Sequence, residues 1–260
     1  MKYSIIFSFF LIAQLVFAES ISQNKINNYS AIYEVYHNET HVAHSSRKLT
    51  SKNNVYELSS KTELAGIFSW FSDITVTETS RLLLKNNKLK FQSYSFQETD
   101  NDKNKSYELY LEKKTGKKKK NNQNSEPLQF FNSHLNKTLP AAENLQDTLG
   151  FTVAIMHDLQ KGNRNIRYTI AEKDNLKTYS LKFLKNKELT ANNKALNTIK
   201  LEHYNPETQH RFTFWCAEEL NYLPVRIQNI KKNGDEILLN LIKLNNKKLI
   251  LDIDDETDDE

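Results

Sequence analysis

The sequence predicts a mainly β protein: a strongly curved antiparallel sheet or open β-barrel, with one amphipathic helix packed on it. About a dozen segments show the apolar–polar alternation of half-buried strands, joined by short polar turns. Val, Ile, Thr, Tyr and Phe are frequent and favour strands, whereas only five glycines occur. One segment has clear helical periodicity, and such a helix must bury its apolar stripe against the sheet.

The strands are predicted from alternation and from the turn chemistry between them. In the N-terminal half they are 30–36, 42–49, 55–64, 74–84, 89–99 and 107–113, with a first turn near Asn38-Glu39 and a polar loop at 100–104. In the C-terminal half they are 165–172, 177–183, 196–203, 210–217, 225–231 and 237–244, with hairpin turns at 205–208 and 232–235.

The helix is predicted over 148–161. Asp147 is placed to cap it, because its carboxylate can accept from N–H groups of the first turn. Leu149, Val153 and Met156 fall at intervals of three or four residues and form one apolar stripe, and Gly162 is a typical C-terminal stop.

Residues 1–18 have the three parts of a cleavable signal peptide. Lys2 supplies the positive charge, 5–17 is an apolar run, and Val16 and Ala18 place small residues before a cleavage point after Ala18. As a helix, that run would reach ~20 Å, short of the roughly 30 Å hydrocarbon core. A lipoprotein signal would need a cysteine at the cleavage point, and the single cysteine is Cys216. We therefore expect export, with no transmembrane segment in the mature chain.

The remaining chain divides by composition. We expect an N-terminal linker at 19–28, a single β-rich domain at 29–251, a mobile Lys/Asn-rich loop at 114–126 and an acidic disordered tail at 252–260. The net charge of +4 conceals a basic body, because seven of the last nine residues are acidic. A basic body could favour anionic partners, but a solvated lysine-rich surface is the simpler interpretation, and the export signal argues against nucleic acid.

Residues that carry chemistry form no recognised motif. Cys216 cannot form an intramolecular disulfide, and strand alternation places it with Phe212 and Phe214 as a small buried side chain. His37, His41 and His44 suggest a metal, but on a continuous strand His44 points away from His37 and His41, so we predict surface histidines and no metal or other cofactor.

Catalytic carboxylates are defined only weakly by the sequence. Glu63, Asp73, Glu78 and Asp147 are the candidates for glycoside hydrolysis, which requires a pair of carboxylates at a three-dimensional spacing that a sequence does not reveal. The absence of a Gly-x-Ser-x-Gly elbow or a similar motif favours a protein that is not an enzyme.

The segment 215–227 is the most distinctive in the chain. It comprises Trp215, Ala217, an acidic pair, and then Leu223, Pro224, Val225, Arg226 and Ile227, and it predicts a strand, an acidic turn and a second strand. With Leu145-Gln146-Asp147, Tyr33-x-Val35-Tyr36 and the strand 198–202, this segment resembles the exported bacterial proteins of the domain of unknown function 3108 family. The resemblance spans most of 29–244 and implies a periplasmic location and a curved sheet with a helix. It supplies no catalytic residues.

Three functions remain open. The leading hypothesis is a non-enzymatic periplasmic protein that binds a hydrophobic or amphipathic component of the cell envelope, a lipid or a lipoprotein, in the curve of the sheet. Hydrophobicity suggests an apolar pocket lined by Ile67, Phe68, Trp70, Phe71, Phe151 and Met156. The alternatives are an envelope assembly or interaction factor that acts through its surface, and an enzyme that acts on cell-wall or glycan material.

Overall fold

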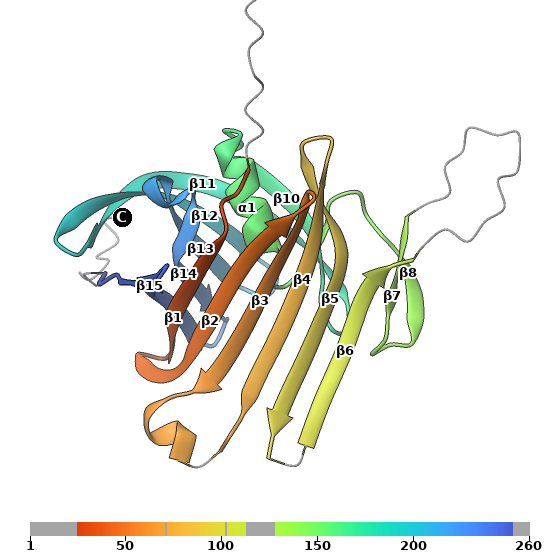
Figure 1. Cartoon of the computed structure of the whole chain (residues 1–260), viewed down its shortest axis with the longest axis horizontal. Helices are drawn as coiled ribbons and strands as arrows, with labels where there is room; N and C mark the ends of the chain where they lie inside the picture. The colour runs from red at the N-terminus through yellow and green to blue at the C-terminus, as the bar shows by residue number, and fades with distance from the viewer. Residues whose placement is uncertain (1–24, 71, 102, 113–127, 252–260) are drawn as a thin grey trace, which may run out of the picture.

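A computed structural model describes residues 25–70, 72–101, 103–112 and 128–251 as one strongly curved sheet around the helix α1 (Phe151–Gln160) (Figure 1). Within these ranges all sixteen strands belong to one sheet, and every pairing except the parallel β9–β10 pair is antiparallel. The predicted fold class is confirmed.

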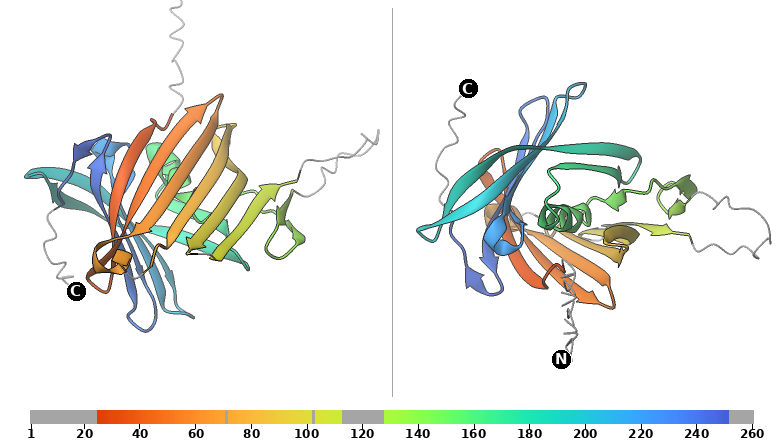
Figure 2. Two further views of the ribbon diagram at one scale, coloured as in Figure 1. Left: turned by 60° about the horizontal axis from the view of Figure 1, so that its bottom comes forward. Right: turned by 90° about the horizontal axis from the view of Figure 1, so that it is seen from above.

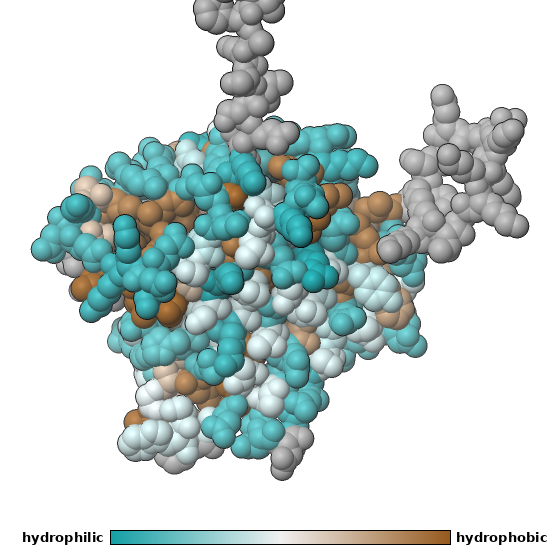
Figure 3. Space-filling model, viewed as in Figure 1, coloured by the Kyte–Doolittle hydropathy of each residue, from teal (hydrophilic) through white to brown (hydrophobic). Residues whose placement is uncertain are grey.

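The first six strands form a meander with one face toward the core. They are β1 (Tyr29–His37), β2 (Thr40–Lys52), β3 (Val55–Leu64), β4 (Thr75–Lys85), β5 (Lys88–Asp100) and β6 (Lys103–Leu111). In β3, Tyr56, Leu58 and Ser60 are buried while the residues between them are partly exposed, as expected for a strand with one wet face. The outer face of these strands is largely hydrophilic (Figure 3).

Three short strands that we did not predict follow the meander: β7 (Gln129–Asn132), β8 (Lys137–Pro140) and β9 (Leu145–Asp147). With three or four residues each, they are too short to show a periodicity that distinguishes them from loops.

The C-terminal half returns to the centre of the same sheet. Its strands are β10 (Asn165–Ala171), β11 (Leu176–Ala191), β12 (Lys194–Asn205), β13 (His210–Ala217), β14 (Leu223–Ile230), β15 (Glu236–Leu244) and β16 (Lys247–Lys248). Because β1 pairs with both β2 and β15, the two halves form one continuous surface that bends around α1 (Figure 2). The β11–β12 hairpin extends well beyond the predicted strands, since the two pair with each other as far as Ala191 and Lys194.

The helix fills the curve of the sheet. Phe151, Ile155 and Leu159 pack with residues from β10–β14, whereas Val153 and Met156 pack toward the N-terminal strands. Since its apolar residues on both sides are almost wholly buried, the helix has no polar face of the usual amphipathic kind.

The start of the helix differs from the prediction. The helix begins at Phe151 rather than at 148, and Asp147 Oδ1 accepts from the N–H groups of Leu149 and Gly150 (2.9 and 2.7 Å) in the turn before it. Gly150 is required there, because a Cβ would lie 2.2 Å from Ser80 Oγ. At the other end Gly162 has a φ of +79°, which confirms the predicted stop.

Side-chain hydrogen bonds join the two halves where no strand pairing does. Ser80 Oγ in β4 donates to Asp147 Oδ2 (2.5 Å), and Gln146 Nε2 donates to the Leu89 carbonyl (3.0 Å). Asn132 Nδ2 donates to the Lys173 carbonyl (3.0 Å). Within the described residues, the two ends of the curved sheet are therefore joined by polar side-chain contacts and not by backbone pairing between strands.

Asparagine makes most of the tight turns. Two-residue hairpin turns need positive φ at both central positions, and in this glycine-poor chain pairs such as Asn53-Asn54, Asn86-Asn87 and Asn192-Asn193 supply it. The predicted turn at Asn38-Glu39 is of the same kind, with φ values of 45° and 69°. The signal peptide 1–18, most of the linker, the lysine-rich loop 114–126 and the tail 252–260 lie outside the described residues.

Candidate functional site

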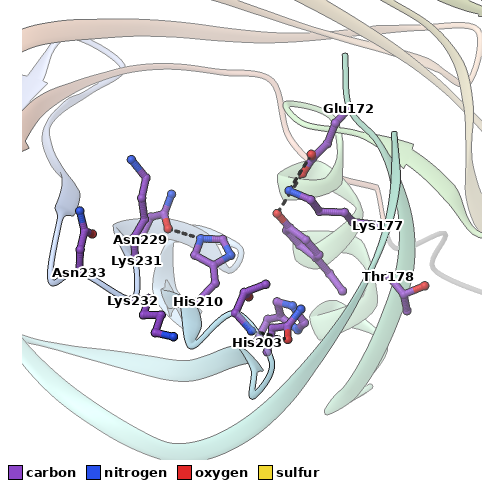
Figure 4. Close-up of a pocket in the computed structure, with 12 residues that line it drawn as sticks. Glu172, Lys177, Thr178, His203, His210, Asn229, Lys231, Lys232 and Asn233 are labelled. Atoms are coloured by element: carbon purple, nitrogen blue, oxygen red, sulfur yellow. Dashed lines mark hydrogen bonds and ion pairs between the residues drawn. The ribbon is translucent and has the colours of Figure 1, made fainter. Parts of the chain in front are cut away.

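A large hollow lies at one end of strands β10–β14. It has a volume of about 960 Å³, and its walls are the loops that join β10 to β11, β12 to β13, and β14 to β15 (Figure 4). Its lining residues are Glu172, Lys177, Thr178, Tyr179, His203, Asn205, Thr208, His210, Asn229, Lys231, Lys232 and Asn233.

Aromatic rings form the floor of the hollow. The rings of Tyr179 and His203, from the paired strands β11 and β12, are stacked with centroids 4.6 Å apart. Phe212 lies 6.1 Å from Tyr179 and 6.4 Å from His210, and it stacks on Phe151 at the start of the helix. The floor is thus continuous with the core under α1, and this continuity holds the rings in place.

The histidine of this floor is held by the backbone of the paired strand. His203 Nδ1 lies 3.3 Å from both the N–H and the carbonyl oxygen of Ser180. Burial lowers the pKa of His203, which favours the uncharged ring against Tyr179. His203 therefore contributes chiefly a ring face to the hollow.

Charged side chains surround the rings. Lys177 Nζ contacts Glu172 Oε2 (2.8 Å), and the Tyr179 hydroxyl donates to the same carboxylate (3.4 Å). Lys231 Nζ contacts Asp235 (2.6 Å), whose pKa is lowered by Lys231 and then by His37.

Lys232 completes the rim as an exposed cation, without an ion-pair partner among the residues that the structure describes. In Figure 4 the labelled side chains surround one shared space, with Glu172 and Lys177 facing His210 and Lys231 across it. A ring floor beneath a rim with two ion-paired lysines and the exposed Lys232 suits a ligand that has both an apolar part and an anionic group.

The predicted apolar pocket is not assembled. Ile67 and Trp70 lie in η1 (Gly66–Trp70) between β3 and β4 and are 59% and 82% exposed, and Phe68 beside them is half-buried. Phe151 and Met156 lie on α1 and are buried in two different core clusters, and Phe71 lies outside the described residues. Only Phe151 comes near the hollow, through its contacts with Tyr179 and Phe212.

The Trp215 segment is structural. The indole is wholly buried, with Lys200 Nζ 4.9 Å and the Arg226 guanidinium 5.7 Å from its ring centre. Arg226 Nε donates to Asn240 Oδ1 (3.1 Å), and the Pro224 carbonyl accepts from the Tyr33 hydroxyl (2.8 Å).

The rest of the motif closes the hairpin around this tryptophan. Ala217, Leu223 and Val225 are buried beside it, and η2 (Glu218–Leu220) makes the acidic turn. The motif therefore positions strands and does not line the hollow.

The catalytic candidates lie in different environments. Glu63 and Asp73 are exposed, and Glu63 is paired with Lys61 (2.7 Å). Glu78 Oε1 accepts from the Tyr94 hydroxyl (2.6 Å), and the charge of Glu78 contributes to the raised pKa of Asp147. Asp147 is wholly buried, and its two oxygens accept from three donors. Cys216 is buried in the core, as predicted, and burial raises the pKa of its thiol, which disfavours the reactive thiolate.

The histidine prediction was wrong in one respect. His41 and His44 lie on the same side of β2, together with Glu34, and the three ligand atoms are all within 4.8 Å of one another. The prediction failed because it assumed a continuous strand, whereas β2 has a bulge between these histidines. His37 is directed elsewhere and contacts Asp235.

The residues of the hollow were also missed. They come from the ends of five strands, and nothing in the sequence around Glu172, His203 or Lys232 signals that the ends meet. A weak signal exists in β13, where His210, Phe212 and Phe214 alternate on one face, but it equally predicts a core strand.

Comparison with known proteins agrees with this geometry. The family model described as "Protein of unknown function (DUF3108)" matches residues 32–240. The chain belongs to the DUF3108 family. The match confirms the resemblance predicted from the Trp215 segment and covers both halves of the sheet, the helix and most of the hollow.

A solved structure shows the same architecture. The crystal structure of a β-barrel-like protein of the domain of unknown function DUF1849 from Brucella abortus matches with a TM-score of 0.55 and 9% identity, over 87% of this chain and 99% of that one. At this identity the likeness concerns the fold alone. No curated protein matches the chain. Within the described residues, no helix has the length and apolar character needed to cross a bilayer.

Proposed function

We propose that this DUF3108 protein is a non-enzymatic periplasmic binding protein that takes an anionic amphipathic molecule of the cell envelope into the hollow between β10 and β14. The observation that carries the proposal is the stacked pair of Tyr179 and His203, backed by Phe212, beneath a rim that carries Lys177, Lys231 and Lys232. The signal-peptide pattern of 1–18 supports the location, with the mature chain beginning at Glu19.

The hollow favours an amphipathic ligand over a purely apolar one. The interior of the curve, where an acyl chain would otherwise lie, is filled by α1, with Val153, Ile155 and Leu159 wholly buried. The remaining space combines ring faces with Lys177, Lys231 and Lys232. An apolar group stacked on the rings brings an attached phosphate, sulfonate or carboxylate to these lysines.

The proposal is tested first with protein purified from the periplasmic fraction. Native mass spectrometry should find a co-purifying anionic amphipath, and N-terminal sequencing should begin at Glu19. Anilinonaphthalene sulfonate, which has an aromatic body and one anionic group, serves as a defined probe for titration by fluorescence.

Two substitutions in the hollow have matched controls on the outer face of the sheet. Lys232→Glu should weaken probe binding about fivefold or more, as expected from ~1 kcal/mol of charge interaction, and Thr208→Trp should block it. Lys48→Glu and Thr79→Trp, on the outer face of β2 and β4, should leave the affinity unchanged. Equal affinities for all four variants and the parent protein, with no co-purifying amphipath, would overturn the proposal.

A further inference from the structure

The β-bulge in β2 places two histidines on the same face of the sheet. Glu34 pairs with His44 and Val35 with Ala43, but the next residue, Tyr36, pairs with His41, so Val42 is the extra residue. In a regular strand His41 and His44 would point to opposite faces. The bulge returns His41 to the face that His44 occupies. On the neighbouring strand, Tyr36 pairs with His41 and Glu34 pairs with His44, and these two residues also share that face because they are two positions apart.

That face is the solvent side of the sheet. Tyr33 and Ala43, the neighbours that alternate with Glu34 and His44, are buried in the core. His44 is exposed, and Glu34 and His41 are half-buried, so a small solute can reach all three side chains. They lie on the paired strands β1 and β2, which fixes their backbones relative to one another (Figure 1).

The three side chains converge on one point. Their ligand atoms lie within 4.8 Å of one another, and the rings of His41 and His44 meet edge to face with centroids 4.7 Å apart. A tetrahedral metal ion with bonds of about 2.0–2.2 Å holds its ligand atoms roughly 3.3–3.5 Å apart. Small rotations of the side chains would close the present spacing to that value.

Neighbouring groups orient the ligands as outer-shell partners do in metal sites. His41 Nε2 lies 3.1 Å from the Ala43 carbonyl, and a ring that donates there carries its lone pair on Nδ1. The Tyr36 hydroxyl donates to Glu34 Oε2 (2.7 Å), which leaves Oε1 for an ion.

Glu63 is a neighbour of this set and not a member of it. It is the residue of β3 that pairs with His44, on the same face, and it forms an ion pair with Lys61 (2.7 Å). An ion bound by Glu34, His41 and His44 would therefore have its fourth position filled by water.

We propose that Glu34, His41 and His44 form a binding site for a divalent transition-metal ion, with Zn²⁺ as the ion that best fits. Two imidazoles and one carboxylate suit Zn²⁺, Ni²⁺ or Cu²⁺, whereas Mg²⁺ and Ca²⁺ prefer oxygen ligands throughout. The site is separate from the hollow and does not depend on the function proposed for it.

The test is a calorimetric titration in which Zn²⁺ is added to the mature protein without an affinity tag, after EDTA has removed any bound metal. We expect one ion per chain, and Co²⁺ should give the visible absorption bands of a low-symmetry site. His41→Ala and His44→Ala should each weaken Zn²⁺ binding at least about tenfold. Glu34→Gln should weaken it as well, and Mg²⁺ should not bind.

The matched control is His134→Ala, since His134 is an exposed histidine paired with Asp174 at a distant hairpin. It should retain the parent affinity. Circular dichroism of each variant separates loss of a ligand from loss of the fold, and Zn²⁺ should raise the melting temperature of the parent but not of the doubly substituted His41→Ala/His44→Ala protein. The proposal would be overturned if the parent bound no Zn²⁺ at about 100 micromolar, or if the double variant bound it equally well.

Discussion

The strands β2–β4 and the strands β12–β14 belong to one sheet but are buried differently. In β3 and in the second half of β4 burial tends to alternate, and the outer face carries serine, threonine and lysine. Every residue is buried from Thr213 to Ala217 and from Leu223 to Ile227. One face of these strands packs against α1, and the other belongs to the core cluster that contains Trp215. In a strand with one solvent-exposed face, the alternation of apolar and polar residues identifies the core residues, whereas a strand that is buried on both faces shows no such alternation.

The second region also holds polar groups that alternation alone would place in solvent. Lys200 and Arg226 are 8% and 6% exposed and flank the Trp215 ring. Leu249 and Leu251, near the described C-terminal end, belong to or pack against the core cluster that contains Trp215. In this region a charged residue therefore does not mark the solvent side of a strand.

The largest expected difference between the two regions concerns the two tryptophans of the chain. Trp215→Ala should lower the free energy of unfolding by about 3–5 kcal/mol, because it leaves a cavity and uncovers two cations. Trp70→Ala, at a site that is 82% exposed, should change it by less than about 0.5 kcal/mol. Urea denaturation followed by circular dichroism measures both. Similar losses for the two variants would mean that the halves do not differ as described.

The next effect concerns the contact between the halves at Asp147. Burial raises the pKa of this carboxyl to about 6, against the opposing hydrogen bonds from Gly150, Ser80 and Leu149. Between about pH 4 and pH 6 the folded state therefore binds a proton that the unfolded state has released, so this group's contribution to stability falls as pH rises through that window.

Asp147→Asn removes this titration while keeping an acceptor for the two backbone N–H groups. Relative to the variant, the parent should lose up to about 3 kcal/mol of unfolding free energy between pH 4 and pH 7. Urea denaturation of both proteins at the two pH values provides the measurement, and shared titrations cancel in the difference. If the unfolding free energies of parent and variant changed equally with pH, the pKa of Asp147 would not be raised in the folded protein.

The smallest effect compares turns in the two halves. Asn54 in the β2–β3 turn and Asn193 in the β11–β12 turn both have positive φ, at 63° and 59°. Replacement by Ala should cost ~1 kcal/mol at either site, and replacement by Gly should stay within about 0.5 kcal/mol of the parent. Asn104→Ala, at an exposed position in β6, is the control and should be neutral. Thermal denaturation of all five variants is sufficient, and unequal costs would mean that the two turns do not carry the same strain.

Much of the framework was predictable. All twelve predicted strands correspond to observed ones because their alternation or their turn residues were strong, as in Val55–Leu64 or around Asn205 to Thr208. The Cys216 environment followed from the same period. The errors arose where period fails: in the four short strands β7–β9 and β16, in the bulge at Val42, and at the helix start. There Asp147 accepts from the turn before the helix instead of from the first helical turn.

The β-rich class, the helix, most of the turns and the family could be predicted from the amino-acid sequence, because they depend on local period, local turn chemistry and one distinctive segment. The tertiary structure was needed to show that His203 and Lys232 share a hollow, that His41 and His44 face Glu34, and that Lys200 is buried. Each of these relations depends on which strands become neighbours, and the histidine pair depends also on the extra residue Val42 in β2. Such relations are set by the curvature and register of the whole sheet, and no local pattern contains them.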